Sequence, residues 1–314
     1  KNYSLVNILI SVILILPSCE IIDNDEDTHI LDMSSKYISL SEVADILASL
    51  HITPEQVREV QDAVRASSDN GYDEEYTMKM LFTAPGAGVG DEETRSASGY
   101  DVPLSRMIEE HLHEMVSTKS SVSSTLDRLG IDGFLQALEA SDIQIYWPFN
   151  DNYDTDVMPV ITFDPEDGSE VNVGYRMIND DGFHRVEEVL VDEEMAEECP
   201  VWIVNRNTDA DHTSLELLRR EDPEWGEGGG DIIIKPASAT SRKSHKSLIL
   251  RDFKANRNYD TWFAGASEFF VKVGAVEDFT ASTEAELRLY TPAVTDFMIV
   301  VKRKMKGQSL PFNA

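Results

Sequence analysis

Oxygen-bearing side chains recur in one short stretch of the chain at a spacing that suits a metal ion. Positions 1, 3, 5, 7, 9 and 12 of a twelve-residue loop are filled by Asn205, Asn207, Asp209, Asp211, Thr213 and Glu216. Hard oxygen ligands at this spacing indicate a Ca²⁺ loop. The stretch departs from that pattern, because position 6 is Ala210 where the turn needs glycine, and position 1 is Asn instead of Asp. The preceding residues also read as a strand, so the alternative is an acidic loop between strands.

A second position that could carry chemistry is Cys19, at the end of an N-terminal apolar run. Residues 5–16 form a twelve-residue run, which is too short for a spanning helix of about 20 residues. With Lys1 before it, the run fits the apolar part of a secretory signal peptide. The segment Leu16-Pro17-Ser18-Cys19 resembles a bacterial lipobox, with a proline at −2 that is less usual there. That resemblance implies thioether lipidation of Cys19 and cleavage before it; the alternative is an uncleaved N-terminal anchor.

The resemblance extends beyond the lipobox. Acidic residues follow the cysteine closely, at Asp23, Asp25, Glu26 and Asp27. Together with the segments 70–76, 85–91 and 144–149, this arrangement resembles the uncharacterised envelope lipoproteins of Bacteroidota. The resemblance implies an outer-membrane location through a lipid anchor, and the acidic stretch favours surface exposure over the periplasm. It supplies no catalytic residues.

Two further segments are candidates for binding a ligand. Trp225 lies in a glycine-rich loop, and an exposed aromatic ring can stack on a sugar or a partner protein at small entropic cost. Arg242, Lys243 and Lys246 form a basic island in an acidic chain, which suits an acidic partner. The alternatives are core packing for the tryptophan and a solvated hairpin tip for the basic island.

The composition limits the partners and the chemistry. The 314 residues carry a formal net charge of −31, and a polyanion is repelled by nucleic-acid phosphates. The two cysteines, Cys19 and Cys199, cannot pair if the first carries lipid. No zinc-protease or serine-hydrolase motif is complete, because 111–114 lacks the second histidine at the required spacing and 265–269 lacks the second glycine. No cofactor other than Ca²⁺ is expected.

The hydrophobic period changes near residue 140. Up to that point apolar residues recur at helical spacing, and we expect helices over about 40–50, 54–70, 73–83, 103–116, 123–129 and 132–140. Beyond it they alternate as in strands. The pattern predicts an α+β protein, with a small helical domain followed by an antiparallel β-sandwich-like domain. The expected divisions are signal peptide 1–18, acidic tether 19–36, helical domain 37–140 and β-rich domain 141–314.

These patterns favour a non-enzymatic, lipid-anchored envelope protein that presents β-domain loops to a glycan or protein partner. A hydrolase of envelope or dietary polymers is one alternative, since distant carboxylates could meet in a cleft. A calcium-stabilised adhesion module is another. The chain stops at Ala314 directly after an expected strand, which indicates either a longer native chain or an unpaired sheet edge.

Lipidation of Cys19 can be tested on protein purified from the native membrane. We expect mass spectrometry to find a mature chain that begins at Cys19 and carries a diacylglyceryl thioether. Cys19→Ala should move the protein out of the membrane fraction, because the anchor is lost. Cys199→Ser is the matched control and should stay in the membrane fraction. An unmodified Cys19 thiol, or an intact leader in the purified protein, would contradict the prediction.

Overall fold

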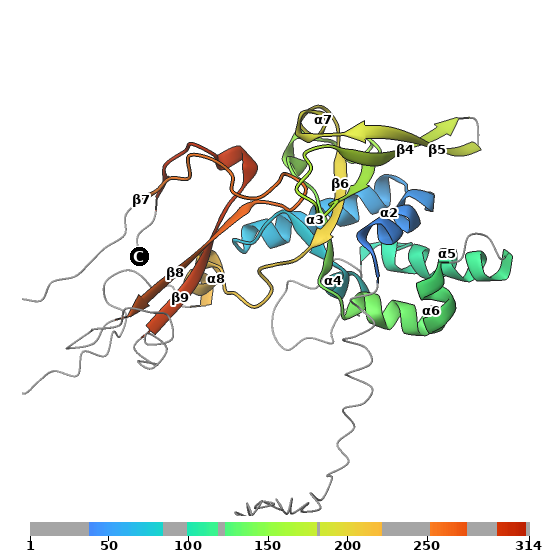
Figure 1. The fold of residues 1–314 in the computed structure, drawn as a ribbon, viewed down its shortest axis with the longest axis horizontal. Helices are drawn as coiled ribbons and strands as arrows, with labels where there is room; N and C mark the ends of the chain where they lie inside the picture. The colour runs from blue at the N-terminus through green and yellow to red at the C-terminus, as the bar shows by residue number, and fades with distance from the viewer. Residues whose placement is uncertain are drawn as a thin grey trace, which may run out of the picture.

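The computed structural model of the protein describes residues 38–83, 99–118, 123–180, 183–221, 252–274 and 294–311. Helices fill most of the described chain up to residue 139, and strands dominate after it (Figure 1). The predicted α+β class is therefore confirmed. None of the described helices is long and apolar enough to cross a membrane.

The described helices are α2 (Leu40–Ser49), α3 (Pro54–Asp69), α4 (Met78–Phe82), α5 (Leu104–Thr118), α6 (Ser124–Glu139), α7 (Glu193–Glu198) and α8 (Leu215–Glu221). The strands are β1 (Glu75–Thr77), β2 (Ile143–Tyr146), β3 (Val160–Phe163), β4 (Asn172–Asp180), β5 (Phe183–Val191), β6 (Val201–Arg206), β7 (Asp252–Phe253), β8 (Ser267–Gly274), β9 (Val294–Val301) and β10 (Leu310–Pro311). Two 3₁₀ turns, η3 (Asn150–Asn152) and η4 (Arg303–Met305), lie among them.

Local capping chemistry explains where the first two helices begin. The Ser39 hydroxyl accepts a hydrogen bond from the Glu42 amide, which satisfies a free donor at the start of α2. Thr53 and Gln56 form a reciprocal capping box at the start of α3, with Pro54 as its first residue. Both predicted helix starts are confirmed. The predicted C-terminal end of α3 is also confirmed, because Gly71 follows its C-cap with a φ of +81°.

The expected helix over 73–83 is wrong in its first half. Residues 75–77 form strand β1, which pairs antiparallel with β2, and only 78–82 are helical. The pairing with β2 gives the β1 backbone hydrogen bonds that a helix would otherwise have supplied. The two short helices expected over 123–129 and 132–140 are confirmed, because α6 joins two helices across Gly130, where a φ of +69° and a ψ of 175° are not helical.

Six strands form one sheet in the order β1-β2-β6-β3-β4-β5. β3 and β6 run parallel, and every other neighbouring pair in this sheet is antiparallel. The described strands thus form a mixed sheet with one parallel pair, where the alternating pattern predicted an antiparallel β-sandwich-like domain. β8 and β9 pair with each other as a separate ribbon, which lies at the opposite end of the molecule from the β4–β5 hairpin (Figure 1).

Both faces of the central sheet are covered. On one face, α2 packs against β3, β4 and β6, and a single core cluster joins buried residues of α2 to α6 with Trp202 of β6 and with Trp147, which directly follows β2. These two rings meet edge to face, with centroids 5.9 Å apart. On the other face, Trp262 and Phe263 and α7 cover Tyr146 and its neighbours. The boundary expected near residue 140 stays a prediction, but side chains on either side of it share one core.

The shared core can be tested with Leu47→Ala in α2. Leu47 is 0% exposed, and its truncation should lower the free energy of unfolding by about 2–5 kcal/mol. We expect one transition, shifted equally in far-UV circular dichroism and in the fluorescence of the buried sheet tryptophans. The control is Val116→Ala in α5, where the side chain is 44% exposed. Two separate transitions, with only the helical one shifted, would show that the halves are independent domains.

Candidate functional site

Several predicted site residues lie outside the residues that the structure describes. They are the lipidation site Cys19 and the ligand-binding candidates Trp225, Arg242, Lys243 and Lys246. Another tryptophan, Trp262, is 1% exposed, and its Nε1 donates to the Glu170 carbonyl at 2.9 Å. Burial raises the pKa of the half-buried Cys199 thiol, which favours a packing role over a reactive one.

The candidate calcium ligands fall into two groups. Asn205 and Asp209 are 0% and 3% exposed, and Asn207 is half-buried. Asp211 and Glu216 are exposed, the latter in the first turn of α8. The structure therefore turns the first three of these residues inward and leaves the other two facing solvent.

Asn207 joins the loop after β6 to the start of β1. Its Oδ1 accepts from the Asp209 amide at 3.0 Å, and its Nδ2 donates to Glu75 Oε2 at 3.2 Å. The other oxygen of Glu75 accepts from the Ser67 hydroxyl at 3.4 Å. Glu75 is itself 6% exposed. A residue of the expected calcium loop is thus in contact with a buried carboxylate 132 positions away in sequence.

Asp73 adds a further buried carboxylate from the turn before β1. Its Oδ2 accepts from the Ala266 amide at 2.8 Å, and its Oδ1 accepts from the Glu74 amide at 2.7 Å. A Cβ at Gly265 would stand 2.7 Å from Asp73 Oδ2, and φ at this glycine is +123°. Glycine is therefore required for the loop before β8 to approach the carboxylate.

We name Asp73, Glu75, Asp209 and Glu268 the carboxylate cluster. Burial is the main cause that raises the pKa of all four side chains, and the charge of Asp73 raises the pKa of the other three further. The pKa of Asp209 rises to about 6 and that of Glu268 to about 8. These four residues come from the turn after α3, β1, the loop after β6 and β8.

The charges of two buried basic side chains lower the pKa of Asp73: Lys302 has the larger effect, and Arg303 has the smaller one. The Arg303 guanidinium nevertheless donates to the Gly265 carbonyl at 3.1–3.2 Å and to the Asp260 carbonyl at 2.9 Å. It also forms an ion pair with Glu193 at 3.4 Å. As the side chains stand, no three His, Cys, Asp or Glu residues of the described chain are arranged to hold a metal ion.

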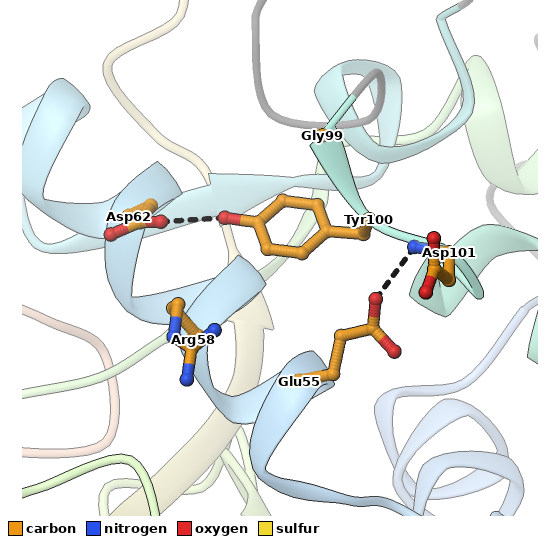
Figure 2. Close-up of a pocket in the computed structure, with 6 residues that line it drawn as sticks. All are labelled: Glu55, Arg58, Asp62, Gly99, Tyr100 and Asp101. Atoms are coloured by element: carbon orange, nitrogen blue, oxygen red, sulfur yellow. Dashed lines mark hydrogen bonds between the residues drawn. The ribbon is translucent and has the colours of Figure 1, made fainter.

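A separate pocket of about 410 Å³ lies on α3 and is lined by Glu55, Arg58, Asp62, Gly99, Tyr100 and Asp101. We call it the α3 pocket. Glu55, Arg58 and Asp62 are spaced i, i+3 and i+7, which places them on one face of the helix. Figure 2 shows the Tyr100 ring extended along that face, with its hydroxyl toward Asp62.

Hydrogen bonds fix the wall of the α3 pocket opposite the helix. The Tyr100 hydroxyl donates to Asp62 Oδ2 at 2.6 Å, and the Asp101 amide donates to Glu55 Oε1 at 2.6 Å (Figure 2). Three carboxylates and one guanidinium give the lining a formal charge of −2 (one minus three). The pocket can accept hydrogen bonds from a polar ligand and offers little apolar surface to bury.

Directly beneath this surface lies Glu59, which is 0% exposed. Its carboxylate accepts from the Leu104 amide at 2.8 Å and from the Tyr76 hydroxyl at 3.2 Å. Burial raises the pKa of Glu59 to about 7, although both hydrogen bonds lower it. The sequence carried one signal for the pocket, the three polar residues on a single helical face, whereas the part played by Tyr100 depends on tertiary structure.

Comparison with protein-family models, with curated proteins and with solved structures finds no match for this chain. The site is therefore interpreted from its own geometry.

Glu59 should make stability depend on pH. Below about pH 4.5 the carboxyl is protonated in both states; from there to about pH 7 only the folded state keeps the proton. The free energy of unfolding should thus fall as pH rises through this window. Glu59→Gln should reduce the loss between pH 5 and pH 8 by up to about 3 kcal/mol.

Denaturant unfolding at both pH values measures this difference. Glutamine can still accept from the Leu104 amide while its own amide donates to the Tyr76 hydroxyl. Glu109→Gln on exposed α5 is the control and should leave the pH profile unchanged. Equal profiles for the Glu59→Gln variant and the wild type would contradict the assignment.

Proposed function

We propose that the protein is a lipid-anchored envelope protein that binds a neutral or amino-bearing glycan in the α3 pocket. The lipobox-like segment ending at Cys19 supports the anchor. The single observation that carries the binding role is the polar lining of the pocket around Tyr100.

The chemistry of the lining selects among ligands. Sugar hydroxyls are donors and acceptors, so the carboxylates of Glu55, Asp62 and Asp101 can accept from them while Arg58 donates. Tyr100 adds a ring edge or face to the contact. A formal charge of −2 disfavours phosphorylated or otherwise anionic ligands. The same charge favours a sugar that carries a free amine.

The loops expected to bind a ligand, around Trp225 and Lys243, stay a separate prediction. They lie outside the described residues, and the α3 pocket is formed by the helical part of the chain. A mutational comparison of the two places can decide between them.

Glycan-array binding by the full-length, detergent-solubilised protein tests the proposal. Arg58→Ala and Asp62→Asn should each weaken binding by roughly three- to tenfold, since a hydrogen bond contributes about 0.5–1.5 kcal/mol. Arg58→Ala removes the guanidinium donors, and Asp62→Asn replaces one acceptor oxygen with an NH₂ group that cannot accept. Arg106→Ala is the matched control: Arg106 is exposed on α5 and pairs with Glu110 instead of lining the pocket. Its binding should equal that of the wild type.

Two outcomes would overturn the pocket assignment. The first is glycan binding that survives both Arg58→Ala and Asp62→Asn but is lost in Trp225→Ala, which would place the site in the β-domain loops. The second is absence of glycan binding together with specific capture of a protein partner that Arg58→Ala does not affect.

A further inference from the structure

We infer that residues 99–104 form a pH-sensitive strap over α3, which closes the α3 pocket in mild acid and releases it when the buried Glu59 carboxyl ionises. We call these residues the strap. As a control of ligand binding, the inference rests on the function proposed for the α3 pocket. The opening of the strap itself can be measured without a ligand.

The outer end of the strap is held by two carboxylates of α3 that water can reach. The Tyr100 hydroxyl donates to Asp62, and this bond forms part of the pocket wall (Figure 2). The Asp101 amide donates to Glu55 beside it. Asp62 is exposed and Glu55 is half-buried, so water can solvate both acceptors whether the strap is closed or open.

The inner end of the strap is held by two buried side chains of the same helix. Gln56, which is 1% exposed, donates its Nε2 to the Val102 carbonyl at 2.5 Å. Glu59, which is 0% exposed, accepts from the Leu104 amide at 2.8 Å. Glutamine carries no charge at any pH. Among the described contacts of the strap, Glu59 is therefore the one carboxylate that lies out of reach of water.

The groups that face Glu59 come from β1, the strap and α3. Tyr76 of β1 donates its hydroxyl to Glu59 Oε1 at 3.2 Å. Burial raises the pKa of Glu59, the bonds from Leu104 and Tyr76 lower it, and the charge of Glu55 on α3 raises it again. Burial, then the bond to Asp62, and then the charges of Asp62 and Glu59 raise the pKa of Tyr100 on the strap.

No cation is among these described contacts of Glu59, and Arg58 on the same helix is exposed. While the strap is closed, the ionised form of Glu59 is therefore a buried charge without a counter-ion, which is strongly unfavourable. Opening the strap lets water reach the carboxylate and removes that penalty. The bond that closes the inner end thus depends on the protonation of its own acceptor.

The direction of the effect follows from the two protonation equilibria. With the strap closed the pKa of Glu59 is about 7, against about 4.5 for a solvated glutamate. Below about pH 4.5 the carboxyl is protonated in both forms, and between about pH 4.5 and pH 7 only the closed form keeps the proton. Closure is therefore favoured fully below about pH 4.5, and this advantage is lost as pH rises to about 7.

Hydrogen exchange of the full-length protein at pH 5.5 and pH 8, without ligand and resolved to single amides, tests the inference. After correction for intrinsic exchange, the Asp101 and Leu104 amides should lose protection by tenfold or more at pH 8. Their exchange should also respond less to dilute urea than that of the most protected α2 amides, because a local opening exposes little surface.

Two matched variants assign the response to Glu59. Glu59→Gln still accepts from the Leu104 amide but cannot ionise, so its strap amides should be equally protected at both pH values. Glu109→Gln makes the same chemical change at an exposed position on α5, and it should keep the wild-type response.

Equal protection of the wild-type strap at pH 5.5 and pH 8 would overturn the inference, and so would a pH response that survives in Glu59→Gln. Strap amides that exchange only with the rate and urea sensitivity of the α2 amides would overturn it too, since the opening would then be global unfolding. Strap opening without any glycan binding would remove only the proposed function. Glycan binding without pH-dependent opening would remove only the strap.

Discussion

The central constraint on this structure is that both faces of its six-stranded sheet must be covered. β2 is buried at all four positions, and β6 at five of six, so neither strand can face water. The helices before residue 140 cover one face, and α7 with the segment around Trp262 covers the other. Burial of apolar area at about 25 cal/mol per Å² is the main favourable contribution to such an arrangement. Segments from the start and the end of the described chain therefore have to meet across the sheet.

Because segments from both ends of the described chain meet across the sheet, some acidic residues are buried between them instead of facing water. The chain carries 58 acidic residues, and most of those that the structure describes are not buried. Asp73 and Glu75 lie at the entry into β1, and Asp209 follows β6, so their positions next to buried strands bring all three inside. Asp73 also contacts the loop that carries Gly265. Isolated buried carboxylates are strongly unfavourable unless paired, protonated or bound to a cation. The cluster is therefore a place where stability has been given up, and such places often carry function.

Local patterns allowed some features to be predicted and left others undetermined. The helix starts at Ser39 and Thr53 could be predicted because capping depends on residues three positions apart. β1 could not, since its identity depends on pairing with β2 nearly seventy residues later. The spacing from Asn205 to Glu216 could not show which of these side chains face inward, because their burial depends on residues remote in sequence. The α3 pocket and the carboxylate cluster both need partners that are remote in sequence, namely Tyr100 and Asp73.

The two edges of the sheet differ in length and in exposure, and the difference affects how readily another chain could pair with each edge. The β1 edge is three residues long and largely buried, whereas β5 is a nine-residue edge strand exposed from 185 to 188. Leu190 on this strand is 72% exposed, which would invite another chain to add a strand. Any chain that paired with β5 would have to desolvate the charged side chains of Arg185, Glu187 and Glu188. Among the described strands, β5 is therefore a long edge whose charged side chains oppose the addition of another strand.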